Sequence, residues 1–160
     1  MTQTEKTRTL AMNGIVAAIY VALCIVVAPV ASGAIQFRVA EGLNHLVVFN
    51  KKLMWGVLAG VIIFNALYST LPDIIFGGGQ TFLALGATAL ISKYVKDVKM
   101  RMVWNTVFFT VSMFMIAWML NITFDLPFWP TYGTTALSEL IIMTISAPVM
   151  YLVGKKVKLN

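Results

Sequence analysis

The chain has 160 residues, of which 59% are hydrophobic, and its 12 Lys and Arg residues outnumber its 6 Asp and Glu residues. The single cysteine and the single histidine exclude a disulfide framework and a cluster of metal-binding histidines. This composition indicates an integral membrane protein. We attribute the net charge of +6 to loops near anionic lipid, not to nucleic-acid binding.

The charged residues divide the chain into long uncharged runs. A charged side chain at the bilayer centre costs roughly 2.5–3.5 kcal/mol, so uncharged runs of about 20 residues predict transmembrane helices. We predict an all-α membrane protein with one domain over residues 1–160, a short tail at 1–9 and six transmembrane helices, two of them short. The expected spans are about 12–30, 37–50, 53–71, 81–94, 102–121 and 134–153.

Eleven of the twelve basic residues fall in four clusters, which predict the orientation of the chain. The clusters are Lys6 and Arg8; Lys51 and Lys52; Lys93, Lys96, Lys99 and Arg101; and Lys155, Lys156 and Lys158. The positive-inside rule places all four in the cytoplasm, with an even number of crossings between successive clusters. We therefore expect a multi-pass protein of the plasma membrane with both termini cytoplasmic. A five-span alternative, with 37–50 as a re-entrant loop, would put the first cluster on the opposite face.

The two short spans, 37–50 and 81–94, predict a hollow on the outer side. Fourteen residues of helix cover about 21 Å, against a hydrocarbon core of about 30 Å. The preceding segments, Pro29–Gln36 and Pro72–Gln80, are expected to fold into an outward-facing bowl, because Pro72 and the three glycines after Phe76 would stop a helix. Irregular backbone at this depth must be buried in protein or line a cavity, so a ligand would meet backbone here.

Arg38, Glu41 and His45 are spaced to share one face of a helix. In one interpretation Arg38 and Glu41 neutralise each other where the helix enters the membrane. In the other, one of them also binds a polar ligand that the other orients. His45 is expected mainly as a hydrogen-bonded residue of the interior, and Gln80, at the end of the second bowl segment, joins the candidate site.

Glu139 is the second candidate, expected about one and a half turns below the outer surface. A carboxylate that faced lipid at this depth would be costly, so Glu139 should point into the helix bundle. There it is either a structural partner for Arg38 or a ligand for a cation or an amidine-like pair of N–H groups. Asp73 and Asp125 are expected in loops that water reaches.

Aromatic residues surround two prolines before the last predicted span, and Trp129 and Tyr132 are the main candidates among them. They form either an interfacial belt or a lid whose rings stack on a planar heterocycle. Asn121 is expected at the outer end of its helix, from where its side chain could reach the same pocket.

Gly14, Ala18 and Ala22 recur every four residues in the first span, and therefore lie on one helix face. Such a stripe serves either internal packing or close contact with another membrane protein. The sequence carries no paired-histidine metal motif, no Gly-x-Ser-x-Gly and no Walker A loop, so we expect neither an enzyme nor a bound metal or cofactor. If transport here uses ATP, another chain must hydrolyse it.

A six-span chain of this size with this stripe resembles a substrate-binding S-component of an energy-coupling factor (ECF) transporter. Residues 33–43, Gly-Ala-Ile-Gln-Phe-Arg-Val-Ala-Glu-Gly-Leu, are similar to the signature of the QueT family of proposed importers of queuosine precursors.

The resemblance implies the high-affinity substrate-binding subunit of an ATP-driven micronutrient importer, which delivers its substrate by docking on a shared transmembrane coupling subunit driven by two ATPase subunits. The implied substrate is a 7-deazaguanine such as preQ1 or preQ0. Glu41 and Glu139 would supply carboxylates, Arg38 would fix the first of them, and Trp129 or Tyr132 would stack on the ring. The stripe would be the docking surface. An S-component for another vitamin and a small ion-coupled secondary transporter stay open as alternatives.

Overall fold

The computed structural model describes residues 2–27 and 37–157, and every regular element in these ranges is helical. The elements are α1 (Gln3–Val26), η1 (Val39–His45), α3 (Leu46–Phe49), η2 (Lys51–Leu53), α4 (Met54–Tyr68), α5 (Leu71–Ile91), α6 (Val98–Phe124) and α7 (Phe128–Lys156). Since η1 continues into α3 as one short helix, and η2 continues into α4, the described residues form six helices. Five are long and apolar enough to cross a membrane, and the predicted all-α membrane fold is confirmed.

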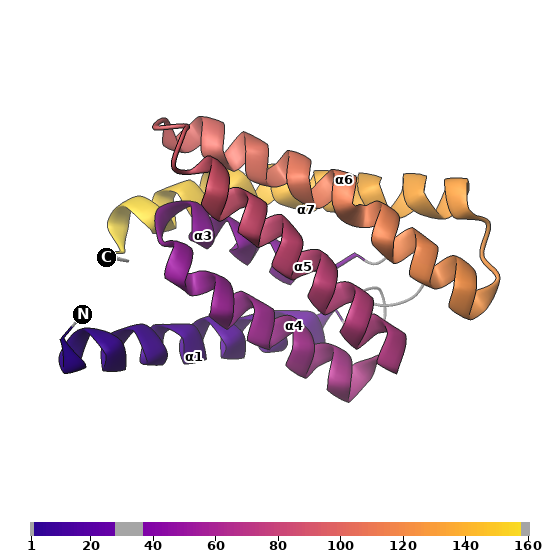
Figure 1. Ribbon diagram of the computed structural model, residues 1–160, viewed down its shortest axis with the longest axis horizontal. Coiled ribbons are helices and arrows are strands. Elements are labelled where there is room, and N and C mark those ends of the chain that lie inside the picture. The colour runs from indigo at the N-terminus through magenta and orange to yellow at the C-terminus, as the bar shows by residue number, and fades with distance from the viewer. Residues whose placement is uncertain (1, 28–36, 158–160) are drawn as a thin grey trace.

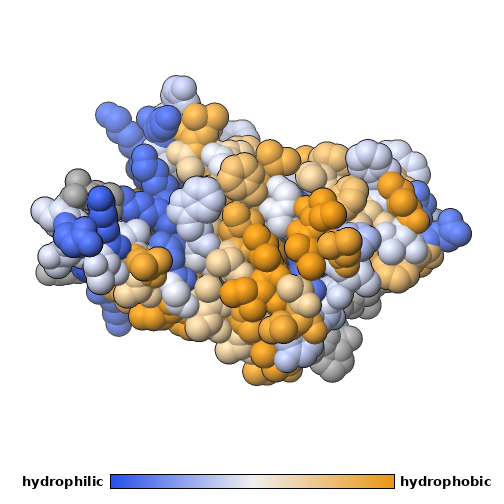
Figure 2. Space-filling view, turned by 60° about the horizontal axis from the view of Figure 1, so that its bottom comes forward, coloured by the Kyte–Doolittle hydropathy of each residue, from blue (hydrophilic) through white to orange (hydrophobic). Residues whose placement is uncertain are grey.

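Successive helices run in opposite directions, and the two ends of the chain lie at the same end of the bundle (Figure 1). The start of α1, the η2 turn, the α5–α6 turn and the end of α7 all lie at this end. These segments carry the residues of the four basic clusters, apart from Lys158, which lies outside the described residues. Figure 2 shows hydrophilic residues gathered there and hydrophobic residues over the middle of the visible face. We call it the basic end. The compartment that it faces stays a prediction.

The short helix of η1 and α3 lies close to the predicted span 37–50. Its seven residues of 3-10 helix and four of α-helix rise roughly 20 Å, so it is shorter than the hydrocarbon core of about 30 Å. All seven η1 residues except Val39 are buried. This helix therefore carries its polar side chains into the protein interior.

The second short span, predicted at 81–94, is wrong, because α5 is a helix of 21 residues. Pro72 stands in the first turn of α5, where a missing N–H costs nothing and the fixed φ favours the helix. The Asp73 carboxylate accepts hydrogen bonds from the N–H and the hydroxyl of Thr70, at 3.2 and 2.8 Å. Asp73 is therefore a buried cap of α5 and not the solvated loop acid expected from the sequence.

The glycines at 77–79 lie inside α5, so Pro72–Gln80 is no loop and forms no bowl. Gly77 allows α5 to approach α4 closely, because a Cβ there would lie 2.8 Å from Nδ2 of Asn65. The glycine run therefore serves helix packing at this position. The other predicted bowl segment, Pro29–Gln36, lies outside the described residues.

Helices α1 and α7 begin earlier than predicted. A capping box between Thr2 and Glu5 starts α1 within the expected tail 1–9. Because the last helix begins at Phe128, Glu139 lies 11 residues inside α7, roughly 16 Å along its axis. This is deeper in the helix than the expected one and a half turns.

Two small-residue stripes meet different surroundings. On α4, a Cβ at Gly56 would lie 2.6 Å from the backbone oxygen of Asn13, and one at Gly60 would lie 2.7 Å from the Tyr20 side chain, so this stripe packs α4 against α1. On α1, by contrast, Gly14, Ala18 and Ala22 are all exposed. They line a shallow groove of about 820 Å³ between α1 and α4. In the described structure, internal packing is thus the role of the α4 stripe.

Candidate functional site

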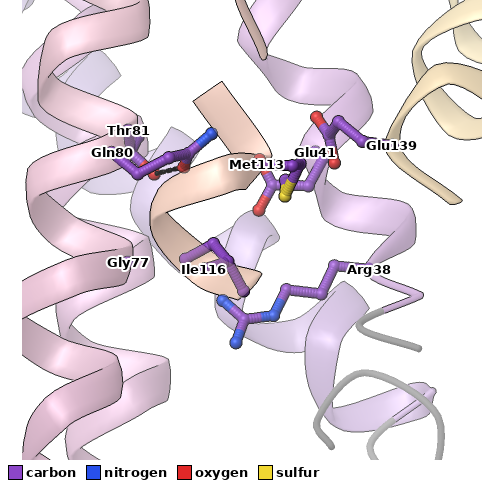
Figure 3. Close-up of a pocket in the computed structure, with 8 residues that line it drawn as sticks. All are labelled: Arg38, Glu41, Gly77, Gln80, Thr81, Met113, Ile116 and Glu139. Carbon is purple, nitrogen blue, oxygen red and sulfur yellow. Dashed lines mark hydrogen bonds between the residues drawn. The ribbon is translucent and has the colours of Figure 1, made fainter. Parts of the chain in front are cut away.

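A small polar cavity lies inside the bundle where the start of the short helix meets α5, α6 and α7 (Figure 3). Its volume is about 10 Å³, which is room for about one water molecule. The residues that line it are Arg38, Glu41, Gly77, Gln80, Thr81, Met113, Ile116 and Glu139. The structure thus brings together four residues that the sequence analysis proposed for one site: Arg38, Glu41, Gln80 and Glu139. Their role in binding stays a prediction.

Both carboxylate oxygens of Glu41 accept hydrogen bonds from buried donors. The Tyr20 hydroxyl on α1 donates to Oε1 at 2.5 Å, and the Asn44 side-chain N–H group donates to Oε2 at 2.6 Å. All three side chains are buried. A carboxylate held at both oxygens keeps one orientation, so Glu41 presents a fixed negative group to the cavity.

Glu139 is buried without such support. Its side chain is 1% exposed, and its Oε1 atom has no hydrogen-bond partner among the described residues. A buried carboxylate oxygen without a donor costs a substantial desolvation penalty. Figure 3 shows Glu139 next to Glu41 at the same side of the cavity. Glu139 is therefore an acceptor that a donor from a ligand would satisfy.

Arg38 supplies the cation of the site. Its side chain is 7% exposed, and its guanidinium carbon lies 5.8 Å from the centre of the Phe64 ring. Figure 3 shows the guanidinium extended toward Ile116 on the other side of the cavity from the two glutamates. Two carboxylates and one guanidinium make the cavity formally negative when all three are ionised, so it is suited to a ligand that carries positive charge or several N–H donors.

Gln80 and Thr81 form the polar wall from α5. Thr81 donates to the Gln80 side-chain oxygen at 3.3 Å, and the Gln80 amide donates to the Ser112 hydroxyl on α6 at 2.8 Å. The amide of Gln80 is therefore tied to α6 while its residue lines the cavity. Met113 and Ile116 supply the apolar wall from α6.

His45 lies deeper in the short helix and does not line the cavity. Asn105 donates to its Nδ1 at 3.2 Å, which leaves the proton on Nε2 to be donated to the Met143 carbonyl at 2.9 Å. Asn105 in turn accepts from Thr88 at 2.7 Å. The structure thus places His45 in a packing network, in agreement with its expected role as a hydrogen-bonded interior residue and apart from the substrate site proposed for it.

Neither aromatic candidate lines the cavity. Trp129 is 76% exposed, and Tyr132 stacks on Phe128 within the first turns of α7. Asn121 donates to the Leu126 carbonyl at 2.7 Å and so holds the turn between α6 and α7. This arrangement fits the interfacial belt better than a lid over a ligand.

Sequence reasoning missed the two donors that hold Glu41. Asn44 carried a readable signal, because it follows Glu41 by three residues and shares its helix face. Tyr20 carried none, since a tyrosine in an apolar run is indistinguishable from a packing residue until α1 is seen to lie against the short helix.

Comparisons with known proteins agree on one family. The family described as QueT transporter matches residues 10–155. The chain is 38% identical to the queuosine precursor transporter QueT of Lactococcus lactis subsp. cremoris (strain MG1363), over an alignment that covers 98% of each protein. No solved structure matches the chain.

Proposed function

This chain belongs to the QueT transporter family, and on that premise we propose that it binds a queuosine precursor in the cavity between Glu41 and Glu139. The observation that carries the proposal is the carboxylate of Glu139, which is buried in a polar cavity with one oxygen unpartnered among the described residues. A 7-deazaguanine such as preQ1 offers what this site lacks. Its guanidine-like edge presents parallel N–H donors, which a carboxylate accepts in a bidentate, charge-assisted pair.

Each of the two carboxylates of the cavity has a partner on this ligand. Glu139 accepts the N–H pair, and the fixed carboxylate of Glu41 faces the cationic aminomethyl group of preQ1. The Arg38 guanidinium balances one of the two negative charges, and Met113 and Ile116 supply apolar surface for the flat ring. Since the cavity has room for about one water molecule, these apolar side chains must move when the ring enters.

Calorimetry on the purified protein tests the substrate. We expect preQ1 to bind tightly, and preQ0, which carries a neutral nitrile in place of the aminomethyl cation, to bind more weakly. Guanine serves as the control for the guanidine-like edge alone. If no 7-deazaguanine binds, the substrate proposal fails, and another vitamin-like ligand has to be sought among molecules that co-purify with the protein.

For the transport step, we propose that the chain is an S-component that docks on a coupling subunit driven by two ATPase subunits. Two observations support this proposal: the sequence has no Walker A loop, and Gly14, Ala18 and Ala22 form an exposed small-residue stripe on α1. Docking surfaces of this kind allow helices to approach closely. A bulky side chain in the stripe should therefore block the partner and leave the cavity intact.

Ala18→Trp tests the docking surface. We expect uptake by cells to be lost while preQ1 binding to the purified variant is unchanged, because Ala18 is exposed and does not line the cavity. Uptake that survives Ala18→Trp would exclude the stripe as the docking surface. Uptake by the chain alone in vesicles, driven by an ion gradient, would instead support a secondary transporter.

The orientation follows from the basic end. We infer that this end faces the cytoplasm, because the described residues of all four basic clusters lie on segments at one end of the bundle. A reporter fused after Asp97, in the α5–α6 turn, should be active only in the cytoplasm.

A further inference from the structure

A second cavity among the described residues opens at the basic end. It lies at the end of the short helix, whereas the polar cavity lies at the start of that helix. It has a volume of about 450 Å³ and lies between the end of the short helix, η2 and the α5–α6 turn. Its lining includes the basic residues Lys51, Lys52, Lys93 and Arg101 and the buried residues Val47 and Val48. We call it the basic hollow. The site proposed for queuosine precursors makes no use of it.

The basic hollow concentrates one sign of charge over an apolar floor. Four cationic side chains line it, and no acidic side chain does so among the described residues. The nearest acid along the chain, Asp97, accepts the backbone N–H of Met100 and caps the start of α6. Its carboxylate is therefore used at the helix terminus.

Arg101 is held in a defined position at the edge of the hollow. Its Nε–H group donates to the Val95 carbonyl at 2.5 Å, across the α5–α6 turn. A guanidinium fixed by Nε still has two terminal NH₂ groups, which provide the planar fork that phosphate oxygens accept. Arg101 can thus present its fork to a phosphate, and the three exposed lysines of the hollow can supply further N–H donors.

Two further lysines, Lys99 and Lys155, lie close to an aromatic pair at the edge of the hollow. Phe49, another lining residue, contacts the Tyr151 ring with 6.4 Å between ring centres. The Lys155 ammonium lies 4.6 Å from the centre of the Tyr151 ring, and that of Lys99 lies 5.8 Å from it. These two lysines add to the hydrophilic residues that gather at the basic end in Figure 2.

We propose that the basic hollow binds the headgroup of an anionic phospholipid. Its phosphate lies among Arg101 and the lysines, and its glycerol and first methylene groups contact the apolar floor of Val47 and Val48. The choice of a lipid over a free anion rests on this apolar floor and on the place of the hollow at the end of a membrane-spanning bundle. Basic pockets between transmembrane helices bind such headgroups in other membrane proteins.

Native mass spectrometry tests the proposal on protein taken from nanodiscs of phosphatidylcholine with and without phosphatidylglycerol. We expect the wild-type protein to retain phosphatidylglycerol selectively. The double variant Lys52→Gln/Lys93→Gln, which keeps the Arg101–Val95 bond, should retain it at least about tenfold less. The matched control Lys6→Gln/Lys156→Gln removes the same charge from exposed positions outside the hollow and should retain it as the wild type does.

Three outcomes would overturn the proposal. Equal loss in both double variants would show that net charge alone attracts the lipid. Equal protection of the wild-type protein against unfolding by inorganic phosphate and by phosphatidylglycerol would assign the hollow to a free anion. Selective retention of a partner subunit's acidic segment in place of lipid would make it a protein interface. The result of the precursor-binding experiment does not depend on this lipid proposal, because preQ1 is proposed to bind in the polar cavity and not in the basic hollow.

Discussion

Two buried polar clusters lie in the same apolar bundle, and they differ in whether their hydrogen bonds are complete. The carboxylate cluster consists of Arg38, Glu41 and Glu139, and the histidine cluster of His45, Asn105 and Thr88. Both join the short helix to the later helices, and all six side chains are buried. The two clusters are therefore built from the same elements at different depths.

In the histidine cluster, hydrogen bonds tie the side chains to one another and to the Met143 carbonyl. In the carboxylate cluster, Oε1 of Glu139 has no partner among the described residues, although Glu41 beside it has two donors. A complete buried network stabilises the fold, whereas an incomplete one costs stability until a donor arrives. From this contrast we infer that the histidine cluster is structural, and it supports the proposal that the carboxylate cluster binds the ligand.

Glu139→Gln gives the largest expected effect on this contrast. The variant keeps the shape but removes the negative charge, so preQ1 binding should weaken by about 2 kcal/mol or more, which is roughly 30-fold. Unfolding of the ligand-free protein should be unchanged or occur at higher temperature, because a buried charge is removed and no hydrogen bond to Oε1 is lost. Calorimetry and thermal unfolding in detergent measure the two effects. A clear loss of ligand-free stability would mean that Glu139 is structural.

Asn105→Leu should give the opposite pattern. The change leaves Nδ1 of His45 without its donor, whereas the Thr88 hydroxyl keeps the Ala84 carbonyl as an acceptor. The loss at His45 should lower the free energy of unfolding by about 1–3 kcal/mol. Binding of preQ1 should remain within about twofold of the wild type, since Asn105 does not line the cavity. Asn121→Leu, which removes one partly exposed hydrogen bond to the Leu126 carbonyl, is the control. Strongly weakened binding with unchanged stability would reverse the assignment of the two clusters.

Tyr20→Phe probes how far the carboxylate cluster extends and should give the smallest of the three effects. Loss of one donor to Glu41 should weaken preQ1 binding by about 1 kcal/mol, or roughly fivefold, because the carboxylate is no longer held in one orientation. Tyr132→Phe is the matched control, since that hydroxyl makes an exposed 3.4 Å contact away from the cavity. If the two variants bind preQ1 equally, Tyr20 serves packing only.

The sequence was most informative where burial is most costly. Arg38, Glu41 and Glu139 stand out because a charged side chain in an apolar run is costly where it faces lipid. Each of the three is buried in the bundle. The same reasoning predicted that the basic clusters share one side of the membrane, and their described residues lie at one end of the bundle. Charge is a strong local signal, since a bilayer penalises its misplacement by several kcal/mol.

The errors came from residues whose effect depends on position or on a partner helix. Pro72 was interpreted as a helix breaker, yet it stands in the first turn, where proline fits. Gly77 was interpreted as part of a loop, although it is needed for close contact with Asn65 on α4. For Trp129 the sequence left an interfacial belt and a stacking lid open, and its exposed position in the first turn of α7 favours the belt. Local patterns do not encode which helices become neighbours.

The size of the cavity sets the rates at which a ligand enters and leaves. A recess of about 10 Å³ admits a heterocycle only while its walls are open, so the apparent affinity is the intrinsic affinity multiplied by the open fraction. Association should accordingly be slower than diffusion, and its observed rate should level off at high ligand concentration where opening becomes limiting. If the proposed substrate binds here, walls that close again behind it would prolong its residence, and the protein would retain each molecule that it captures from a dilute source.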